Sequence, residues 1–192
     1  FPQIKSPEYR GETVQIVASG PDSPEPMIMN SIIQALALSK EEVLITTPYF
    51  VPSESVLMMM RIAALSRVKV KLLIPEKTDS RFVQMASESL FDSLLEAGVE
   101  IYLYQKGFIH GKTTVFDRKI AMIGTANMDN RSFDLNFEVN AVIYDETVAK
   151  QMADDFFNDL KVARKVDFNQ WRHRSKIKVF LEKIVYLTSS LL

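Results

Sequence analysis

A histidine, a lysine and an aspartate stand close together in this 192-residue sequence, as His110, Lys112 and Asp117. Alternate residues of a strand share a face, so His110 and Lys112 are predicted to project into one site. A histidine can attack a substrate or transfer a proton near neutral pH, and the lysine adds a positive charge beside it. Asp117 can hold the histidine in one tautomer, provided that the fold brings the two side chains together.

A second group of polar residues follows shortly afterwards. Gly124, Thr125 and Asn127 come after a predicted strand and offer backbone N–H groups, a hydroxyl and an amide. These are the donors that an anionic phosphoryl oxygen needs. Further on, Asn136 and Glu138 alternate with apolar residues, so a strand there would turn one polar face towards the site. Together these residues predict a site that binds a phosphoryl group.

The spacing His-x-Lys-x4-Asp-x6-Gly-Thr-x-Asn resembles the signature motif of the phospholipase D superfamily. Within that superfamily, nearly the whole chain is similar to the bacterial cardiolipin synthases and corresponds to the second of their two catalytic halves. The similarity is carried by four segments, at residues 17–23, 47–52, 107–110 and 124–138. Thr125 stands where much of the superfamily has serine, and the retained hydroxyl is expected to keep the same role.

The resemblance implies a mechanism and a substrate. One histidine attacks phosphorus and forms a phosphohistidine, while a second, from the other half, acts as acid to the leaving alcohol and then as base for the acceptor. Lys112 and Asn127 would bind phosphoryl oxygens, Glu138 would brace a catalytic histidine, and no metal or other cofactor takes part. The expected reaction joins two phosphatidylglycerol molecules into cardiolipin with release of glycerol. Whether His110 is the nucleophile or the acid/base stays open.

Only one copy of this motif is present. The other histidine, His173, lacks the lysine and the aspartate at the same spacing. The partner motif is therefore expected from an N-terminal catalytic half of the same polypeptide, or from a second copy of the chain in a homodimer. The chain begins with Phe1, which we interpret as the start of an excised piece. Little or no transferase activity is expected of this piece alone.

Two other functions fit parts of the sequence. The first is a half-sized homodimeric phosphodiesterase or nuclease of the same superfamily. The acidic composition of residues 1–160 disfavours it, because a nucleic-acid groove is basic, and no nucleic acid is expected as a partner. The second is a non-catalytic membrane-binding or assembly module whose chemistry resides elsewhere.

Composition narrows the remaining possibilities. The chain has no cysteine, which excludes disulfides and thiolate metal sites, and only two histidines, which excludes a histidine-rich metal cluster. No apolar run approaches the roughly 18 residues that a membrane span needs. We expect the piece itself to be soluble and to belong to a cell-membrane enzyme whose catalytic part faces the cytoplasm.

Charge is distributed unevenly along the chain. Residues 161–192 contain eight basic and two acidic residues, whereas residues 1–160 contain 15 basic and 22 acidic ones. Within the basic tail, apolar residues recur at helical spacing as Ile177, Phe180, Leu181, Ile184 and Leu187. Such a helix can rest on an anionic membrane surface, which is the partner that we expect, or pack on its own domain or on the missing half.

The elements that must position these residues alternate between strands and helices. Apolar patterns and turn signals predict four strands separated by helices, at residues 13–19, 43–47, 68–74 and 99–104. A hairpin, a further strand and two helices follow, at residues 110–116 with 119–123, then 136–144, 145–160 and 174–187. This order predicts an α/β fold of the phospholipase D type, an α-β-α sandwich with a mixed, largely parallel sheet. The catalytic domain is expected over residues 1–160 and a basic helical tail over residues 161–192.

Overall fold

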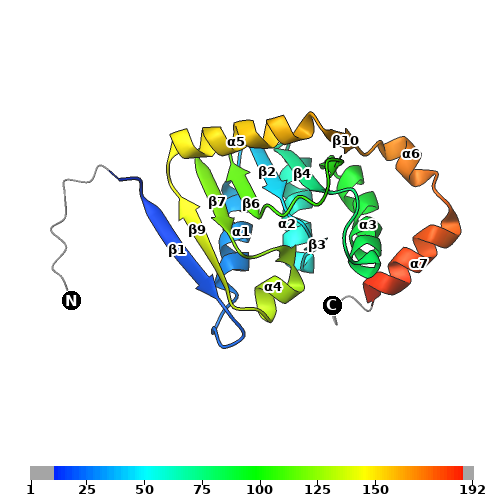
Figure 1. Ribbon diagram of the computed structural model, residues 1–192, viewed down its shortest axis with the longest axis horizontal. Coiled ribbons are helices and arrows are strands. Elements are labelled where there is room, and N and C mark those ends of the chain that lie inside the picture. The colour runs from blue at the N-terminus through cyan, green and yellow to red at the C-terminus, as the bar shows by residue number, and fades with distance from the viewer. Residues whose placement is uncertain (1–10, 188–192) are drawn as a thin grey trace.

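The computed structural model of the protein describes residues 11–187, which form an eight-stranded mixed sheet between helical layers (Figure 1). The strands lie in the spatial order β1 (Val14–Ser19), β9 (Glu138–Ile143), β7 (Ile120–Gly124), β6 (Thr113–Phe116), β2 (Glu42–Thr46), β4 (Lys69–Pro75), β5 (Glu100–Tyr104) and β10 (Ala163–Lys165). A small parallel sheet consists of β3 (Phe50–Val51) and β8 (Met128–Asp129).

Helices cover both faces of the large sheet, as an α-β-α sandwich requires. One face packs against α1 (Met27–Leu38), α2 (Glu54–Leu65) and α3 (Arg81–Glu96), and the other against α5 (Glu146–Leu160). Successive strand residues point to opposite faces, so β2 sends Val43 and Ile45 to the first core and Leu44 to the second. The remaining helices are α4 (Asn130–Asp134), α6 (Phe168–Arg172) and α7 (Lys176–Leu187).

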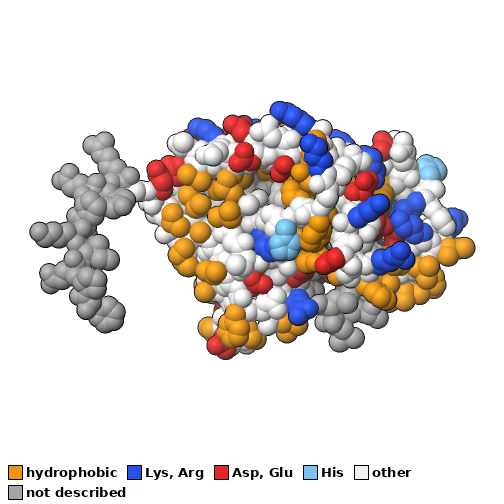
Figure 2. Space-filling model, viewed as in Figure 1, with side chains coloured by type: hydrophobic (Ala, Val, Ile, Leu, Met, Phe, Trp, Pro, Cys, Tyr) orange, Lys and Arg blue, Asp and Glu red, His pale blue; other side chains and the backbone are white. Residues whose placement is uncertain are grey.

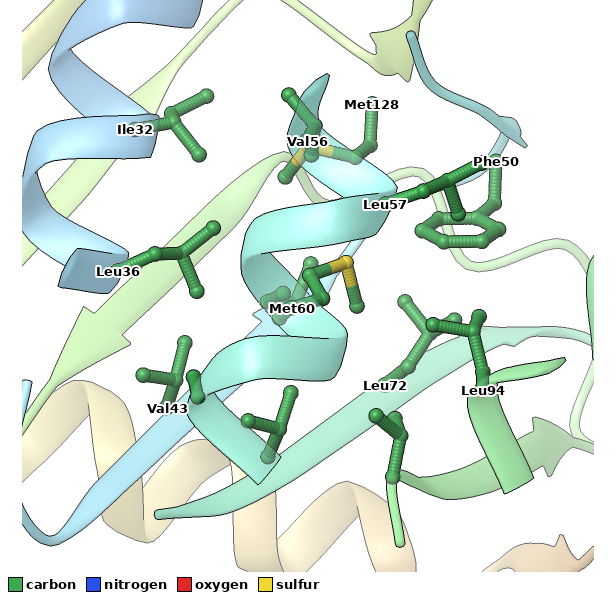
Figure 3. Close-up of a cluster of buried hydrophobic side chains, with 14 of the residues drawn as sticks. Ile32, Leu36, Val43, Phe50, Val56, Leu57, Met60, Leu72, Leu94 and Met128 are labelled. Carbon is green, nitrogen blue, oxygen red and sulfur yellow. The ribbon is translucent and has the colours of Figure 1, made fainter. Parts of the chain in front are cut away.

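The larger core lies between the sheet and helices α1 to α3 (Figure 3). Helix α1 buries Ile28, Ile32 and Leu36, because residues four apart share one face of a helix. Phe50 and Met128, from the small β3–β8 sheet, join the same core and are almost fully buried. The loop that carries the predicted Asn127 is therefore anchored directly in the hydrophobic core.

The sheet contains fewer parallel pairs than the sequence suggests. Only β2–β4 and β4–β5 are parallel neighbours, and the other five pairs are antiparallel. The expectation of a largely parallel sheet assumed that β1 would join the strands that alternate with helices. Instead β1 pairs with β9, because the β6–β7 hairpin and β9 occupy the space between β1 and β2. The α/β class and the mixed sheet are confirmed.

The turn of the β6–β7 hairpin contains Asp117. Asp117 and Arg118 have φ angles of 51° and 52°, and Lys119 N–H donates to the Phe116 carbonyl at 3.0 Å. This is the two-residue turn whose twist suits a hairpin. The Asp117 carboxylate accepts hydrogen bonds from three consecutive N–H groups at the start of β2, those of Lys40 at 2.8 Å, Glu41 at 2.8 Å and Glu42 at 2.9 Å. Asp117 thus ties the hairpin to β2.

The basic segment packs on the body of the domain. Strand β10 pairs antiparallel with β5 at the sheet edge, and α6 and α7 lie against α3 (Figure 1). The segment predicted as a tail therefore begins inside the sheet, and its last five residues, 188–192, lie outside the described residues. Within residues 11–187, every helix is too short or too polar to span a bilayer.

The carboxylate of Glu100 holds this edge together. It accepts hydrogen bonds from Lys71 and Lys165, both at 2.5 Å, and from the Tyr102 hydroxyl at 2.7 Å. Burial alone would raise the pKa of Glu100, but the three donors outweigh it and lower the pKa from 4.5 to about 2. Because the folded pKa is the lower one, this interaction stabilises the fold above pH 4.5 and is lost as the pH falls towards 2.

Replacing Asp117 with Ala removes the shared acceptor of three backbone N–H groups. Hydrogen bonds to a charged acceptor contribute about 1.5–3 kcal/mol each, and two of these three are exposed, so the free energy of unfolding should fall by about 2–4 kcal/mol. The matched variant Asp117→Asn tolerates the same backbone and keeps one acceptor, so it should lose less than half as much. Urea unfolding measures both, and wild-type stability of Asp117→Ala would contradict the role.

Replacing Glu100 with Gln removes the charge that its donors stabilise. We expect the free energy of unfolding at pH 7 to fall by about 2 kcal/mol, less than the full pKa shift implies because Lys165 is half exposed. The difference from wild type should shrink by about half at pH 3, because the wild-type carboxylate is then losing its advantage over the unfolded chain. Urea unfolding at both pH values measures it, and a constant difference would argue against this account.

Candidate active site

His110 and Lys112 lie side by side in the extended segment that leads into β6. Lys112 Nζ is 3.0 Å from Nδ1 of His110 and 3.3 Å from its carbonyl oxygen. The two side chains share one site, as their spacing predicts, although β6 itself begins only at Thr113. Because an ammonium group can only donate, Nδ1 is the acceptor in this pair and Nε2 remains free of it. The ring of His110 is exposed, so a substrate can reach it.

Two aromatic rings extend the site away from the histidine. The Phe108 ring lies 5.4 Å from the His110 ring and 5.8 Å from the Tyr49 ring, measured between centroids. The Tyr49 hydroxyl donates to both oxygens of Asp79, at 2.8 and 2.9 Å. Burial raises the pKa of Tyr49, and Asp79 raises it further, so the phenol stays protonated. Tyr49 belongs to residues 47–52, one of the segments that carry the family resemblance, and the structure places it near His110 through Phe108.

Negative charge surrounds the lysine on its other side. Burial lowers the pKa of Lys112, and the carboxylates of Glu138 and Asp129 oppose this shift. Glu138 accepts a hydrogen bond from the Asn136 amide at 3.2 Å, and it begins β9 on the same face as the buried Asn140. Asn136 lines the cavity described below, and Glu138 acts on Lys112 through its charge.

Asp129 is a site residue that the sequence prediction missed. Its carboxylate caps α4 by accepting from Ser132 N–H at 2.7 Å, and it also accepts from the side chain of Asn127. Burial raises the pKa of Asp129, these hydrogen bonds oppose the shift, and the charge of Glu138 adds to it. An aspartate three residues before Ser132 is a recognisable helix-cap signal, but it does not reveal the proximity to Lys112.

The backbone N–H groups expected to bind phosphate are already used inside the fold. Gly124 N–H donates to the Lys112 carbonyl at 3.3 Å, Thr125 N–H to the Val139 carbonyl at 3.0 Å, and Asn127 N–H to Ser132 Oγ at 3.1 Å. The prediction that the backbone N–H groups of residues 124–127 bind an anion is therefore corrected, because those of Gly124, Thr125 and Asn127 donate to other groups of the protein. These groups complete the ladder to neighbouring strands, which is how buried N–H groups are satisfied in folded proteins.

Gly124 and Thr125 serve to hold β9. A Cβ on Gly124 would overlap Asn140 Oδ1 and the Val139 carbonyl oxygen, so only glycine fits. The Thr125 hydroxyl accepts from Val139 N–H at 3.0 Å and lies 3.4 Å from the Val139 carbonyl. The expected role of the Thr125 hydroxyl as a phosphoryl ligand is thus replaced by a contact with the backbone of β9.

Asp117 lies away from the histidine. It follows β6 at the end opposite His110, and at about 3.3 Å per residue the strand alone separates its two ends by roughly 10 Å. Its carboxylate binds the backbone of β2, as described above. Asp117 was predicted to orient the histidine only if the fold brought the two side chains together, and the length of β6 instead places it at the opposite end of that strand.

A polar cavity of about 350 Å³ adjoins this group. Five of its lining residues have been described above, namely Tyr49, Asp79, Asn127, Asp129 and Asn136, and three are new, namely Ser80, Val83 and Arg131. Asn127 Oδ1 is buried without a hydrogen-bond partner in residues 11–187, so a bound ligand could supply a donor. Within the same residues, no cluster of three His, Cys, Asp or Glu side chains is suited to holding a metal ion.

One part of the large sheet is left bare next to the site. Val14 and Ile16 of β1, Ile123 of β7 and Val139 of β9 are between 43% and 65% exposed. Cross-strand register places Ile16 and Ile123 each opposite Ala141 of β9, so these side chains share one face. Figure 2 shows hydrophobic side chains gathered over β1, β7 and β9 on this face. We refer to these four residues as the bare sheet patch.

Comparison with known proteins identifies the family. The family described as "Cardiolipin synthase, PLD-like domain" matches residues 32–160. A cardiolipin synthase of Clostridium perfringens is 49% identical over 178 residues, which are 93% of this chain and 37% of that protein. The major cardiolipin synthase of Bacillus subtilis is 49% identical over 161 residues, which are 84% and 33%. The chain thus spans well under half the length of these relatives.

Solved structures show the same fold. The phospholipase D family member Nuc from Salmonella typhimurium has a TM-score of 0.69 at 18% identity, covering 81% of this chain and 99% of that one. Phosphatidylserine synthase of Haemophilus influenzae has a TM-score of 0.70 at 15% identity, covering 93% of this chain and 48% of that one. These likenesses confirm the predicted phospholipase D-like fold.

The matched region contains the His110–Lys112 pair, the loop with Asn127 and the polar start of β9. Of the strands of the large sheet, only β1 and β10 lie outside the matched region. Sequence identity, fold and site therefore agree, and the chain belongs to the PLD-like domain family of the cardiolipin synthases.

Proposed function

We propose that the protein is a phosphatidyltransferase that makes cardiolipin from two phosphatidylglycerol molecules and releases glycerol, and that this chain supplies its C-terminal catalytic half. The observation that carries the proposal is the His110–Lys112 pair in a chain of the cardiolipin synthase family. The charge of Asp129, which lines a polar cavity, reaches Lys112 and so links the pair to that cavity. The exposed His110 ring gives a nucleophile or a proton carrier, and Lys112 supplies positive charge next to it.

The reaction proceeds in two balanced steps. In the first, one histidine attacks the phosphorus of a phosphatidylglycerol, the bond from phosphorus to the glycerol oxygen breaks, and the leaving glycerol takes a proton from a second histidine. In the second step, that histidine removes the proton from a hydroxyl of the acceptor phosphatidylglycerol, whose oxygen attacks the phosphohistidine and frees the first ring. In the arrangement seen, Nδ1 accepts from Lys112, so Nε2 of the neutral ring carries the proton and suits the acid that protonates the leaving glycerol. As the nucleophile, His110 must first release the Lys112 contact and carry its proton on Nδ1, which frees the Nε2 lone pair.

Neighbouring side chains have defined tasks in this proposal. Lys112 and Asn127 bind the phosphoryl oxygens, which gain negative charge as the bond to phosphorus changes. Glu138, oriented by Asn136, keeps Lys112 charged against the effect of burial and braces a catalytic histidine. The polar cavity suits a glycerol headgroup, since its lining offers both hydrogen-bond donors and acceptors.

The second histidine comes from another catalytic half in this proposal. The bare sheet patch supports a docked partner, because exposed apolar surface of this kind marks interaction sites. The share of the relatives that this chain covers, 37% and 33%, leaves ample length for such a half in one polypeptide. A second copy of this chain would fill the same place in the isolated piece.

In this proposal the enzyme acts at the cell membrane, because its substrate is a membrane lipid, and we propose that its catalytic part faces the cytoplasm. A nuclease is the weaker alternative, because Asp79, Asp129 and Glu138 make the site acidic and would repel a polynucleotide. The same acidity is tolerable for a small headgroup that presents hydroxyls as well as one phosphate.

Replacing His110 with Gln in the complete protein tests the proposal. We expect phosphatidyl transfer to fall by at least about 10³-fold, because a glutamine amide can neither attack phosphorus nor carry the proton in place of the imidazole ring. The matched control is His173→Gln, since His173 bonds the Asn169 carbonyl at 2.7 Å on α6, outside the site, and should keep near wild-type turnover. Thin-layer separation of labelled phosphatidylglycerol and cardiolipin measures both, and retained activity of the His110 variant would refute the assignment.

The 192-residue chain alone is expected to show little or no transfer. It carries one histidine at the site, and the two-step reaction needs two. The measurement is cardiolipin formation by the purified chain, compared with the complete protein at equal molar concentration in the same detergent micelles. Turnover at the rate of the complete protein, with the chain monomeric by sedimentation, would sink the idea of a half-enzyme.

A further inference from the structure

Helix α7 turns its apolar face to solvent, which is unusual for a helix on the surface of a folded domain. Its apolar stripe points to solvent, with Ile177 73%, Phe180 63% and Leu187 80% exposed, while Leu181 and Ile184 are also exposed. Amphipathic helices of soluble domains normally turn such a stripe towards the core. Here an apolar ridge about 15 Å long, from Ile177 to Leu187, is left uncovered, given 1.5 Å of rise for each residue of the helix.

The inner side of α7 packs Tyr186 against the core and is otherwise held by charge. Glu182 is fully buried, and its carboxylate accepts from Arg174 Nη2 at 2.8 Å. Arg174 also pairs with Asp92 of α3 at 3.2 Å, and Lys178 pairs with Glu88 of α3 at 2.8 Å. We call these five residues the α3–α7 ion network. Burying charges is costly unless they are paired. A rotation of α7 that turned the stripe inward would separate Glu182 from its partners, so the network opposes that rotation.

An aromatic residue reinforces this orientation. The Arg174 guanidinium lies 4.0 Å from the centre of the Trp171 ring, and Trp171 stacks on Phe91 of α3 with 5.0 Å between ring centres. Arg174 is thereby sandwiched between an aromatic face and two carboxylates, and its side chain is only 11% exposed. The network therefore fixes which side of α7 faces outward.

The outer side of α7 is apolar and cationic, with no acid. Lys176 and Lys183 are exposed alongside the stripe, as is Arg172 of α6. The only carboxylate between residues 173 and 187 is Glu182, and it is turned inward. Figure 2 shows hydrophobic side chains with blue basic groups beside them at the α7 end of the molecule. Protein interfaces are depleted of lysine, whereas anionic bilayers attract it.

We propose that α7 lies flat on an anionic lipid surface, with its stripe in the interface and Lys176 and Lys183 at the level of the headgroups. Helices with this combination bind the boundary between headgroups and acyl chains. The α3–α7 ion network makes the contact rigid, so the catalytic domain is held at one angle to the lipid. The inference rests on the proposed function only for the choice of phosphatidylglycerol as the anionic lipid.

Vesicle co-sedimentation of the 192-residue chain tests the proposal. The stripe variant Phe180→Gln with Ile184→Gln should bind vesicles of phosphatidylcholine with 30% phosphatidylglycerol at least about tenfold more weakly than wild type. Its matched control is Leu38→Gln with Leu65→Gln, two leucines that are each 67% exposed on α1 and α2, and it should bind like wild type. Equal binding by the stripe variant and wild type would overturn the proposal.

The charge requirement is tested separately. Lys176→Gln with Lys183→Gln should weaken binding to these vesicles by about fivefold per lysine and leave binding to pure phosphatidylcholine unchanged. The control removes Lys106 and Lys119, two exposed lysines elsewhere on the surface, and should have less effect. If the stripe variant instead abolishes self-association in sedimentation velocity and leaves vesicle binding intact, the stripe is a protein interface and the proposal fails.

These measurements are independent of turnover. Vesicle binding by the stripe with no His110-dependent transfer in the complete protein would overturn the proposed function alone. Transfer in detergent micelles by a protein whose stripe variant binds vesicles normally would overturn this inference alone.

Discussion

The site depends on the close approach of β9 to the end of β7. Gly124 permits it, because any side chain there would collide with Asn140 and the Val139 backbone. The Thr125 hydroxyl then fastens the two strands by bonding Val139. With β9 held at this distance, Glu138 stands at its start and its charge reaches Lys112. Much of the motif that looks like a phosphate-binding loop is therefore scaffold, and it works by setting the spacing between two strands.

The features that depend on neighbouring residues in the sequence were predicted correctly. Strand alternation placed His110 with Lys112 and aligned the polar residues around Glu138, and turn length identified the β6–β7 hairpin. The misjudged parts depend on contacts between distant segments. Asp117 binds a strand start 75 to 77 residues away, and β1 pairs with a strand more than a hundred residues later. Neither partner is visible in the spacing of the motif.

The site carries more negative than positive charge. Lys112 is paired against the carboxylates of Glu138 and Asp129, and the cavity wall adds Asp79 against Arg131. A phosphodiester bound to this surface therefore meets three carboxylates and two cations, so the surface by itself offers it no net positive charge.

Strand β10 has a consequence for how the chain ends. It pairs with β5 and so covers what would otherwise be the open edge of the large sheet. An uncovered strand offers unpaired N–H and C=O groups to other chains and promotes aggregation. The segment that leads into α6 and α7 therefore also acts as an edge protector. A chain shortened before Ala163 would lose solubility through its sheet edge, whatever its last helix binds, so only truncations that keep β10 separate the two effects.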